Sequence, residues 1–103
     1  MVALIYTTFD DIVLARRVSK TLVEEQLVAC VNIIPDIESI YNWKGKIEEA
    51  NENILIAKTT DENVKKTIQR IKMLHTYELP DIIVIPIIGG HKEYLEYIRN
   101  QTT

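Results

Sequence analysis

The order in which strand-like and helix-like patterns follow one another is the feature that most constrains this fold. Apolar, mostly β-branched or aromatic residues over 2–9 predict a strand, and apolar residues spaced three and four apart over 12–27 predict an amphipathic helix. Two strand-like segments then meet near Gly45. A second helical pattern, ending at residue 74 or 75, leads into the apolar run at 81–88, which predicts another buried strand. The predicted order is therefore β-α-β-β-α-β, with a short helical stripe at the C-terminal end.

This order predicts an α+β fold of the ferredoxin-like type, with one antiparallel sheet and helices on one face. A chain of 103 residues has room for one hydrophobic core, so we expect a single domain over 1–103. Seventeen isoleucines favour strands and a dense core. The sheet face without helices would carry apolar residues that need a cover, and self-association is the simplest way to supply it.

Local turn and cap residues mark where the elements begin and end. Gly45 supplies the positive φ that a tight hairpin requires, and Pro35 predicts a bulge, bend or edge because it cannot donate to a ladder. The acidic pair at 10–11 predicts a helix N-cap, and the Thr-Thr-Asp-Glu segment at 59–62 fits a capping box. We expect the polar stretch at 48–53 to face solvent.

Charge and composition argue against several classes of partner. The formal net charge is −3, and the basic residues are scattered, which argues against nucleic acid. No apolar run approaches the roughly 20 residues that span a bilayer, and the N-terminal run lacks a basic leader, so we expect no membrane anchor and no signal peptide. The single cysteine cannot form an internal disulfide, which predicts a reducing, cytoplasmic location.

The sequence carries no recognisable catalytic motif. It has no nucleophile elbow, no glycine-rich phosphate loop and no CxxC pair. The acidic pair Glu48-Glu49 has no partner chemistry within sequence reach. We therefore expect a protein that is not an enzyme and that requires no cofactor.

Two residues are candidate metal donors, each with a structural alternative. Cys30 lies among apolar neighbours, where it is either a small buried hydrophobe or a soft thiolate ligand for copper or zinc. His75 lies at a predicted helix end, where it either caps the helix or offers its imidazole to a metal or ligand. Tyr77 and Glu78 follow closely, and Pro80 directs the chain into the next strand in either case.

Several ordered segments together resemble the CutA divalent-cation tolerance family. The central segment is ACVNIIPDIESIYNWKGKIEE, and LIAKTT is similar to the lysine-threonine signature of the family's third strand. LHTYELPDIIVIPI resembles its histidine-proline-tyrosine-glutamate motif, and the opening IYTTFDD and the closing EYLEYI match as well. The resemblance spans nearly the whole chain. It implies a ferredoxin-like fold in a tight, PII-like trimer and a role in tolerance of copper and other divalent metals.

The resemblance also implies metal donors. His75, Cys30 and Glu78 match positions of the family motifs. Tyr6 and Leu74 stand where some members have an additional cysteine and histidine, so a copper site built from those extra groups cannot form here. His75 then needs Cys30, Glu78 or a neighbouring subunit to complete a site for a divalent cation.

A second set of matching positions is expected to line a ligand cleft. The first hypothesis is a homotrimer that binds divalent cations, copper(II) first, at low or moderate affinity. The alternative is a PII-like signalling module whose intersubunit clefts take a small anionic ligand, and a third is a stable trimeric scaffold without a ligand. Aromatic residues beside the hairpin can line such a cleft or pack in the core or a subunit interface. The expected cleft residues are Lys58, Tyr77, Trp43, Tyr41 and Glu48.

Overall fold

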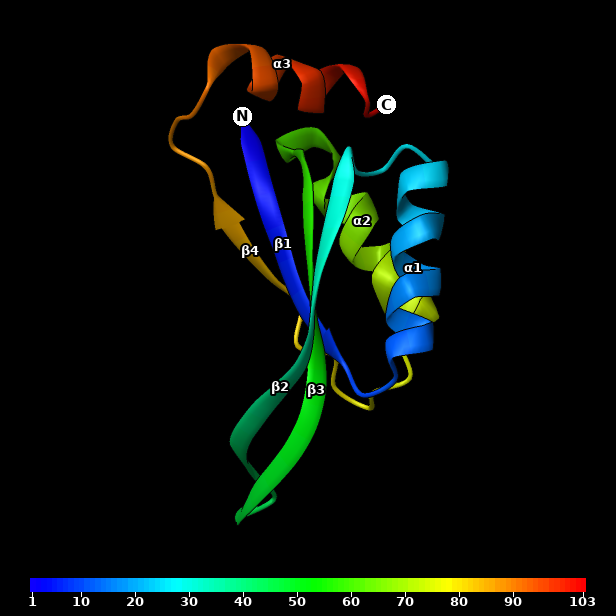
Figure 1. The fold of residues 1–103 in the computed structure, drawn as a ribbon, viewed down its shortest axis with the longest axis vertical. Coiled ribbons are helices and arrows are strands. Elements are labelled where there is room, and N and C mark those ends of the chain that lie inside the picture. The colour runs from blue at the N-terminus through cyan, green and yellow to red at the C-terminus, as the bar shows by residue number, and fades with distance from the viewer.

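The computed structural model describes residues 1–103, and its elements follow the order that the sequence predicts (Figure 1). The expected strand at 2–9 and the expected helix end at Leu74 are both confirmed. The elements are β1 (Val2–Phe9), α1 (Ile12–Glu24), β2 (Cys30–Trp43), β3 (Lys46–Thr60), α2 (Asp61–Leu74), β4 (Ile83–Pro86) and α3 (Lys92–Asn100).

The four strands form one antiparallel sheet in the order β2-β3-β1-β4. The central strand β1 pairs with β3 along its whole length, from Val2 opposite Thr60 to Phe9 opposite Asn53. On its other side β1 pairs with the short strand β4. The ferredoxin-like βαββαβ fold predicted from the sequence is therefore confirmed.

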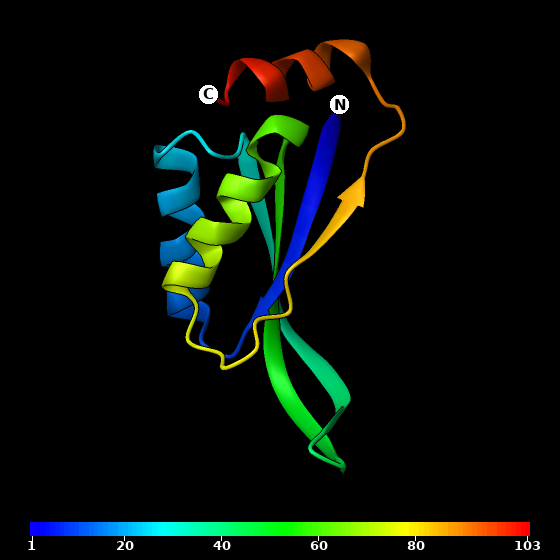
Figure 2. The same ribbon diagram turned by 180° about the vertical axis from the view of Figure 1, so that it is seen from behind.

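Helices α1 and α2 lie side by side on one face of the sheet (Figures 1 and 2). Alternate strand residues point to this face, where Ile5, Phe9 and Leu55 are fully buried. They pack with Leu22 of α1 and Ile71 of α2 in the main hydrophobic core. Burying a side chain of this size contributes roughly 1.5–3 kcal/mol, so this face supplies much of the fold's stability.

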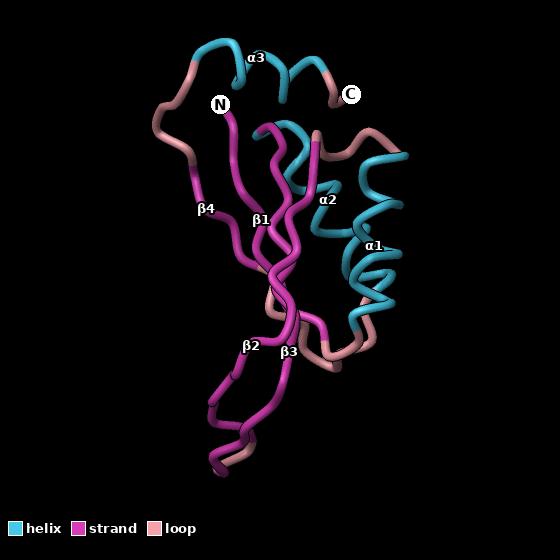
Figure 3. The backbone as a smooth tube through the Cα atoms, viewed as in Figure 1, coloured by secondary structure: helices cyan, strands magenta, loops and turns pink.

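The hairpin of β2 and β3 extends beyond the helices (Figures 1 and 3). We call its outer part, residues 37–52, the hairpin arm. Its turn has φ values of 52° at Lys44 and 82° at Gly45, as a tight turn with two left-handed residues requires. The β2–β3 register shifts after Ile34, which confirms the irregularity predicted at Pro35.

The two sheet-facing helices begin differently. Asp11 caps α1 as predicted, because its carboxylate accepts a hydrogen bond from the N–H of Val13 at 2.8 Å. The capping box predicted for the Thr-Thr-Asp-Glu segment does not form. Thr59 donates its hydroxyl instead to the carbonyl oxygen of Leu27 at 2.6 Å, and the N-cap residue Thr60 makes no side-chain cap bond.

Three expectations about length and burial are wrong. Helix α1 ends at Glu24, earlier than predicted, and Gln26 beyond it takes a left-handed φ of 59°. Strand β4 is a four-residue edge strand, exposed along its length, rather than a buried strand over 81–88. Glu52 and Asn53, predicted to face solvent, are each only 8% exposed. The end of α1 is set by local backbone hydrogen bonds, whereas the burial of Glu52 and Asn53 depends on contacts with distant parts of the chain.

Helix α3 lies across one end of the sheet, near the N-terminus of the chain (Figure 1). Its Ile98 packs with Val2 and Ala29 in a second, smaller core. We call the sheet face opposite α1 and α2 the open face; on its edge strand, Ile83 and Ile85 are 54% and 42% exposed. No helix has the length and apolar character needed to cross a membrane.

Candidate functional site

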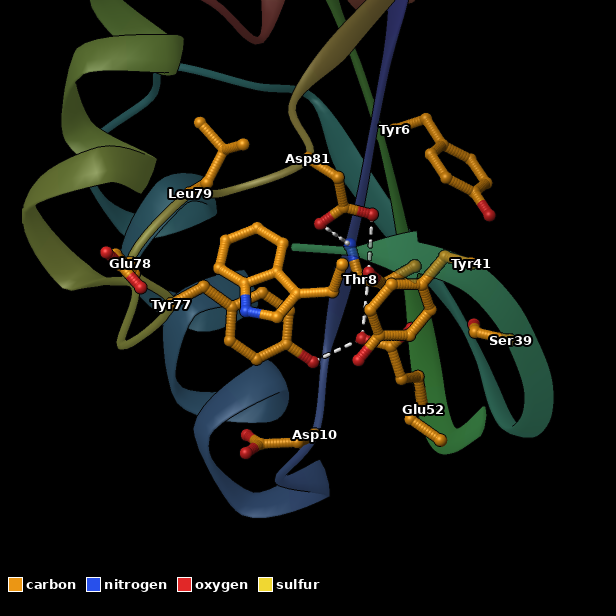
Figure 4. Close-up of a pocket in the computed structure, with 12 residues that line it drawn as sticks. Tyr6, Thr8, Asp10, Ser39, Tyr41, Glu52, Tyr77, Glu78, Leu79 and Asp81 are labelled. Carbon is orange, nitrogen blue, oxygen red and sulfur yellow. Dashed lines mark hydrogen bonds between the residues drawn. The ribbon is translucent and has the colours of Figure 1, made fainter. Parts of the chain in front are cut away.

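A cleft opens where the hairpin arm leaves the body of the sheet (Figure 4). It lies between β1, the arm and the loop at 77–81, and its volume is about 600 Å³. Four of its lining residues are aromatic, four are acidic and none is basic, so the cleft has an aromatic wall and a negative charge. The lining residues are Tyr6, Thr8, Asp10, Ser39, Tyr41, Trp43, Ala50, Glu52, Tyr77, Glu78, Leu79 and Asp81.

Thr8 holds two of the carboxylates next to each other (Figure 4). Its Oγ1 lies 2.5 Å from Oδ2 of Asp81 and 3.2 Å from Oε2 of Glu52. The N–H of Thr8 also donates to Oδ1 of Asp81 at 3.4 Å, and Tyr77 donates its phenolic hydroxyl to Oε2 of Glu52. The single hydroxyl hydrogen of Thr8 serves one acceptor at a time, so two acidic groups share one donor.

The protonation states of Glu52 and Tyr77 follow from this contact. Burial would raise the pKa of Glu52, but hydrogen bonds from Ser39, Tyr77 and Thr8, together with the nearby imidazole of His75, outweigh it and hold the pKa below the ordinary value of 4.5. Burial, followed by the hydrogen bond to Glu52, raises the pKa of Tyr77 far above its usual range. At neutral pH the pair therefore consists of a neutral phenol donor and a buried, charged carboxylate.

His75 positions two residues of the cleft but does not line it. Its ring stacks on Phe9, with the ring centroids 4.1 Å apart and an interplanar angle of 10°. Nε2 lies 2.7 Å from the carbonyl oxygen of Thr8, and Nδ1 accepts the N–H of Tyr77 at 3.2 Å. Since a carbonyl oxygen only accepts, Nε2 carries the ring hydrogen. Both ring nitrogens are thus occupied, and the backbone N–H ends α2 by donating to Ile71.

Cys30 and Lys58 lie elsewhere, beside α3. They face each other across the β2–β3 ladder. The hydroxyl of Tyr94 lies 3.6 Å from Sγ of Cys30 and accepts a hydrogen bond from Nζ of Lys58 at 3.2 Å. Cys30 is partly exposed, so it is not the fully buried residue that one alternative predicts.

The structure brings together three of the five residues predicted for a ligand cleft. Tyr77, Trp43 and Tyr41 line it, whereas Lys58 and Glu48 do not. Lys58 is six positions beyond Glu52 along β3, close to α3, and therefore cannot supply a positive charge to the cleft. The charged residues that line the cleft within one chain are all acidic, which does not favour a small anionic ligand at this site; a ligand in clefts between subunits stays a prediction.

Sequence reasoning missed five polar residues of the cleft, which are Thr8, Asp10, Ser39, Glu52 and Asp81. Asp10 was assigned only to a helix cap, and Asp81 follows the Pro80 of a family-like segment in which only His75, Tyr77 and Glu78 were given a role. Strands β1 and β3 pair with Phe9 opposite Asn53. Thr8 precedes Phe9 and Glu52 precedes Asn53, so Thr8 and Glu52 lie diagonally across this pair and their side chains meet. That register was the missing signal, and a single sequence does not contain it.

The three predicted metal donors do not converge within one chain. Glu78 is exposed at the cleft, Cys30 lies beside α3, and the ring of His75 is hydrogen-bonded at both nitrogens. No group of three or more His, Cys, Asp or Glu side chains in the chain is arranged to hold a metal ion.

Comparison with known proteins places the chain in a family. A family model described as CutA1 divalent ion tolerance protein matches residues 3–101. The divalent-cation tolerance protein CutA of Thermus thermophilus is 47% identical over 88 residues, covering 85% of each chain. Protein CutA of Homo sapiens is 37% identical over 97 residues, covering 94% of this chain and 54% of that protein. The chain thus spans about half the length of the human relative.

Solved structures show the same fold. The divalent cation tolerance protein Cut A1 of Thermus thermophilus superposes with a TM-score of 0.97 at 42% identity, covering 100% of both chains. The periplasmic divalent cation tolerance protein CutA of Archaeoglobus fulgidus superposes with a TM-score of 0.94 at 42% identity, covering 98% of both.

The expected cytoplasmic location is contradicted by the relatives. The chloroplastic Protein CutA of Arabidopsis thaliana is 37% identical over 98 residues, covering 95% of this chain and 54% of that protein. The Archaeoglobus structure is described as periplasmic. The prediction failed because a lone cysteine cannot pair within its chain in any compartment, so Cys30 does not report a redox environment.

The resemblance inferred from the sequence is confirmed. The family model covers nearly all of the chain, the relatives share more than a third of its residues, and the solved structures share its whole fold. These relatives are named for tolerance of metal ions or for the family, and not for a reaction. This chain belongs to the CutA1 divalent ion tolerance protein family, and its function is in the tolerance of divalent metal ions.

Proposed function

We propose that the protein acts in metal tolerance as a homotrimer that binds divalent cations, copper(II) first, and that it does so without catalysing a reaction. Its membership of the divalent ion tolerance family carries this proposal. The negative charge of the cleft supports it by attracting cations towards the exposed carboxylate of Glu78, although the four carboxylates do not converge on one point.

Exposed apolar residues support the assembly. Ile40 and Ile47 on the hairpin arm are 65% and 71% exposed, because the arm extends beyond the helices that cover one face of the sheet. On the opposite edge, Ile83 and Ile85 of β4 are about half exposed beside an unpaired strand edge. Exposed apolar residues and an unpaired strand edge favour aggregation of a monomer, and both are covered when subunits pair.

The predicted donors fit a site shared between subunits better than a site within one chain. Glu78 and Cys30 are accessible, and a carboxylate with a thiolate suits copper or zinc. His75 can coordinate a metal only after it gives up its bond to Thr8 or Tyr77. We therefore assign the first metal contacts to Glu78 and Cys30, with His75 as the donor that has to be released.

Isothermal titration of the assembled protein with copper(II) tests these donors one at a time. Glu78→Gln and Cys30→Ser are expected to weaken binding, each by roughly tenfold, while Glu49→Gln, a matched charge change on the arm, leaves it unchanged. Equal binding by all three variants and by the native protein would reject these donors. Loss of binding in His75→Gln alone would make the released imidazole the principal ligand.

A second candidate function is a small-molecule binding module, in line with the PII-like alternative. The observation that favours it is the cleft itself, whose volume of about 600 Å³ lies within the range of small-molecule pockets. A cleft of this size with a preformed hydrogen-bond network can select a ligand larger than a bare ion.

A further inference from the structure

We propose that the cleft between the hairpin arm and the loop at 77–81 binds a small organic cation, such as a quaternary ammonium or guanidinium ion. The proposal concerns the second candidate function and does not depend on whether the protein binds metal. Three properties of the cleft carry it: its uncompensated charge, its aromatic walls and its size.

The carboxylates of the cleft are not matched by basic residues in its lining. Asp10, Glu52, Glu78 and Asp81 line it, and no lysine, arginine or histidine does. Glu52 is only 8% exposed and still accepts the hydroxyls of Thr8 and Tyr77, an arrangement that favours its charged form. The hydrogen bonds keep Glu52 charged without neutralising it, so the cleft keeps a negative charge that attracts a positively charged ligand.

The neighbouring basic residues do not fill that role. Lys58 donates to Tyr94 beside α3, away from the cleft. His75 does not line the cleft, and both of its ring nitrogens are occupied by hydrogen bonds to the backbone of Thr8 and Tyr77. Lys44 lies at the hairpin turn with Nζ 5.4 Å from the ring centroid of Trp43, and it does not line the cleft.

The walls are aromatic on several sides. Tyr6 comes from β1, Tyr41 and Trp43 from the arm, and Tyr77 from the loop after α2. Aromatic faces attract organic cations through the ring quadrupole, and several rings around one cavity are typical of sites for quaternary ammonium groups. Carboxylates beside such rings also suit a guanidinium ion, which donates several hydrogen bonds in one plane.

The size of the cleft favours an organic cation over a bare metal ion as its ligand. A volume of about 600 Å³ leaves room for a ligand of several heavy atoms. The acidic groups are not arranged to hold a metal, since no three His, Cys, Asp or Glu side chains converge. The site therefore offers charge over a broad surface, which matches a diffuse organic cation.

Trp43 provides a local readout because it is the only tryptophan in the chain. The assembled, full-length protein would be titrated in the presence of EDTA with choline, with methylguanidinium, and with 3,3-dimethylbutan-1-ol as the uncharged counterpart of choline. Trp43 fluorescence and isothermal titration are measured together. We expect a saturable response to at least one of the two cations and none to the alcohol.

Two variants assign the response to the cleft. Glu52→Gln keeps the shape of the side chain but removes its charge, and it is expected to weaken binding roughly tenfold or more. Glu48→Gln makes the same change in net charge on the same strand outside the cleft, and it is expected to bind as the native protein does. Circular dichroism and native mass spectra of both variants verify that fold and assembly are intact.

Three outcomes would overturn the proposal. They are no response to either cation by both methods, equal binding of the uncharged alcohol, and equal weakening by the two variants. Because EDTA removes divalent metal, a failure here leaves the metal-binding proposal standing. Failure of copper binding would in turn leave this site unaffected.

Discussion

Glu52 is the residue on which the chemistry of the cleft depends. It belongs to a stretch that is polar in sequence, yet it is nearly buried and accepts two hydroxyl groups from distant segments. Those hydrogen bonds have a consequence for stability as well as for binding. They favour the ionised carboxylate in the folded state, and they link folding to pH.

Acid should destabilise the native protein in part through Glu52. The pKa of Glu52 is lowered in the folded state, so its contribution is fully present above the ordinary value of 4.5 and is lost as pH falls through the folded pKa. Urea unfolding midpoints, measured from neutral pH to below 4.5, should fall less steeply for Glu52→Gln than for the native protein. Parallel curves for the two proteins would show that Glu52 is not the group responsible.

Replacing His75 tests whether it is a structural residue. His75→Ala removes the stack on Phe9, leaves the Thr8 carbonyl without its donor, and leaves the Tyr77 N–H without its acceptor. We expect a loss of roughly 2–4 kcal/mol in the free energy of unfolding, measured by urea denaturation. His75→Gln can replace one of the two hydrogen bonds and should lose less. Unchanged stability in His75→Ala would contradict the positioning role.

At the scale of elements, the hairpin turn can be tested with a pair of glycines. Gly45 has a φ of 82°, where a Cβ is strained although nothing lies within 4 Å of it, so Gly45→Ala should cost roughly 1–2 kcal/mol. Gly89 also has open space around it but no left-handed φ, and Gly89→Ala should be neutral or slightly stabilising. Thermal unfolding of both variants measures the difference, and equal effects would rule out the backbone explanation.

The elements differ in how well their sequences predicted them. Strand β1 and helix α2 were predicted to within a residue, because the periodicity of apolar residues that defines them is local. Strand β4 has an equally apolar sequence, but its burial depends on what lies beyond the sheet edge, which is not encoded locally. The aromatic half of the cleft was predicted from Tyr41, Trp43 and Tyr77, whereas its acidic half depends on the pairing of β1 with β3.

At the scale of the whole molecule, one chain leaves apolar residues and strand edges uncovered. Its dimensions of 45 × 25 × 22 Å reflect a hairpin arm that extends well beyond the helices (Figure 1). The arm carries isoleucines on a face that no helix covers, and both edges of the sheet are unpaired. These features account for the proposed assembly, in which neighbouring subunits cover what one chain leaves exposed.

A charge placed on the arm should therefore break the assembly. Ile47 is 71% exposed in the single chain, so Ile47→Lys should have little effect on a monomer. If the arm lies in a subunit interface, the buried lysine disfavours association and shifts the protein towards monomer. Val13→Lys, a matched change at a 56% exposed site on α1, should not. Light scattering after size exclusion measures the mass, and an intact trimer in Ile47→Lys would exclude the arm from the interface.

The most direct test of the account is native mass spectrometry of the untagged protein, titrated with copper(II) and then with zinc. The spectrum reports subunit number and metal stoichiometry together. We predict a trimer that takes up copper in discrete steps, one per chain or one per trimer. A monomer would contradict the proposed architecture, and a trimer that binds neither metal would contradict the proposed function.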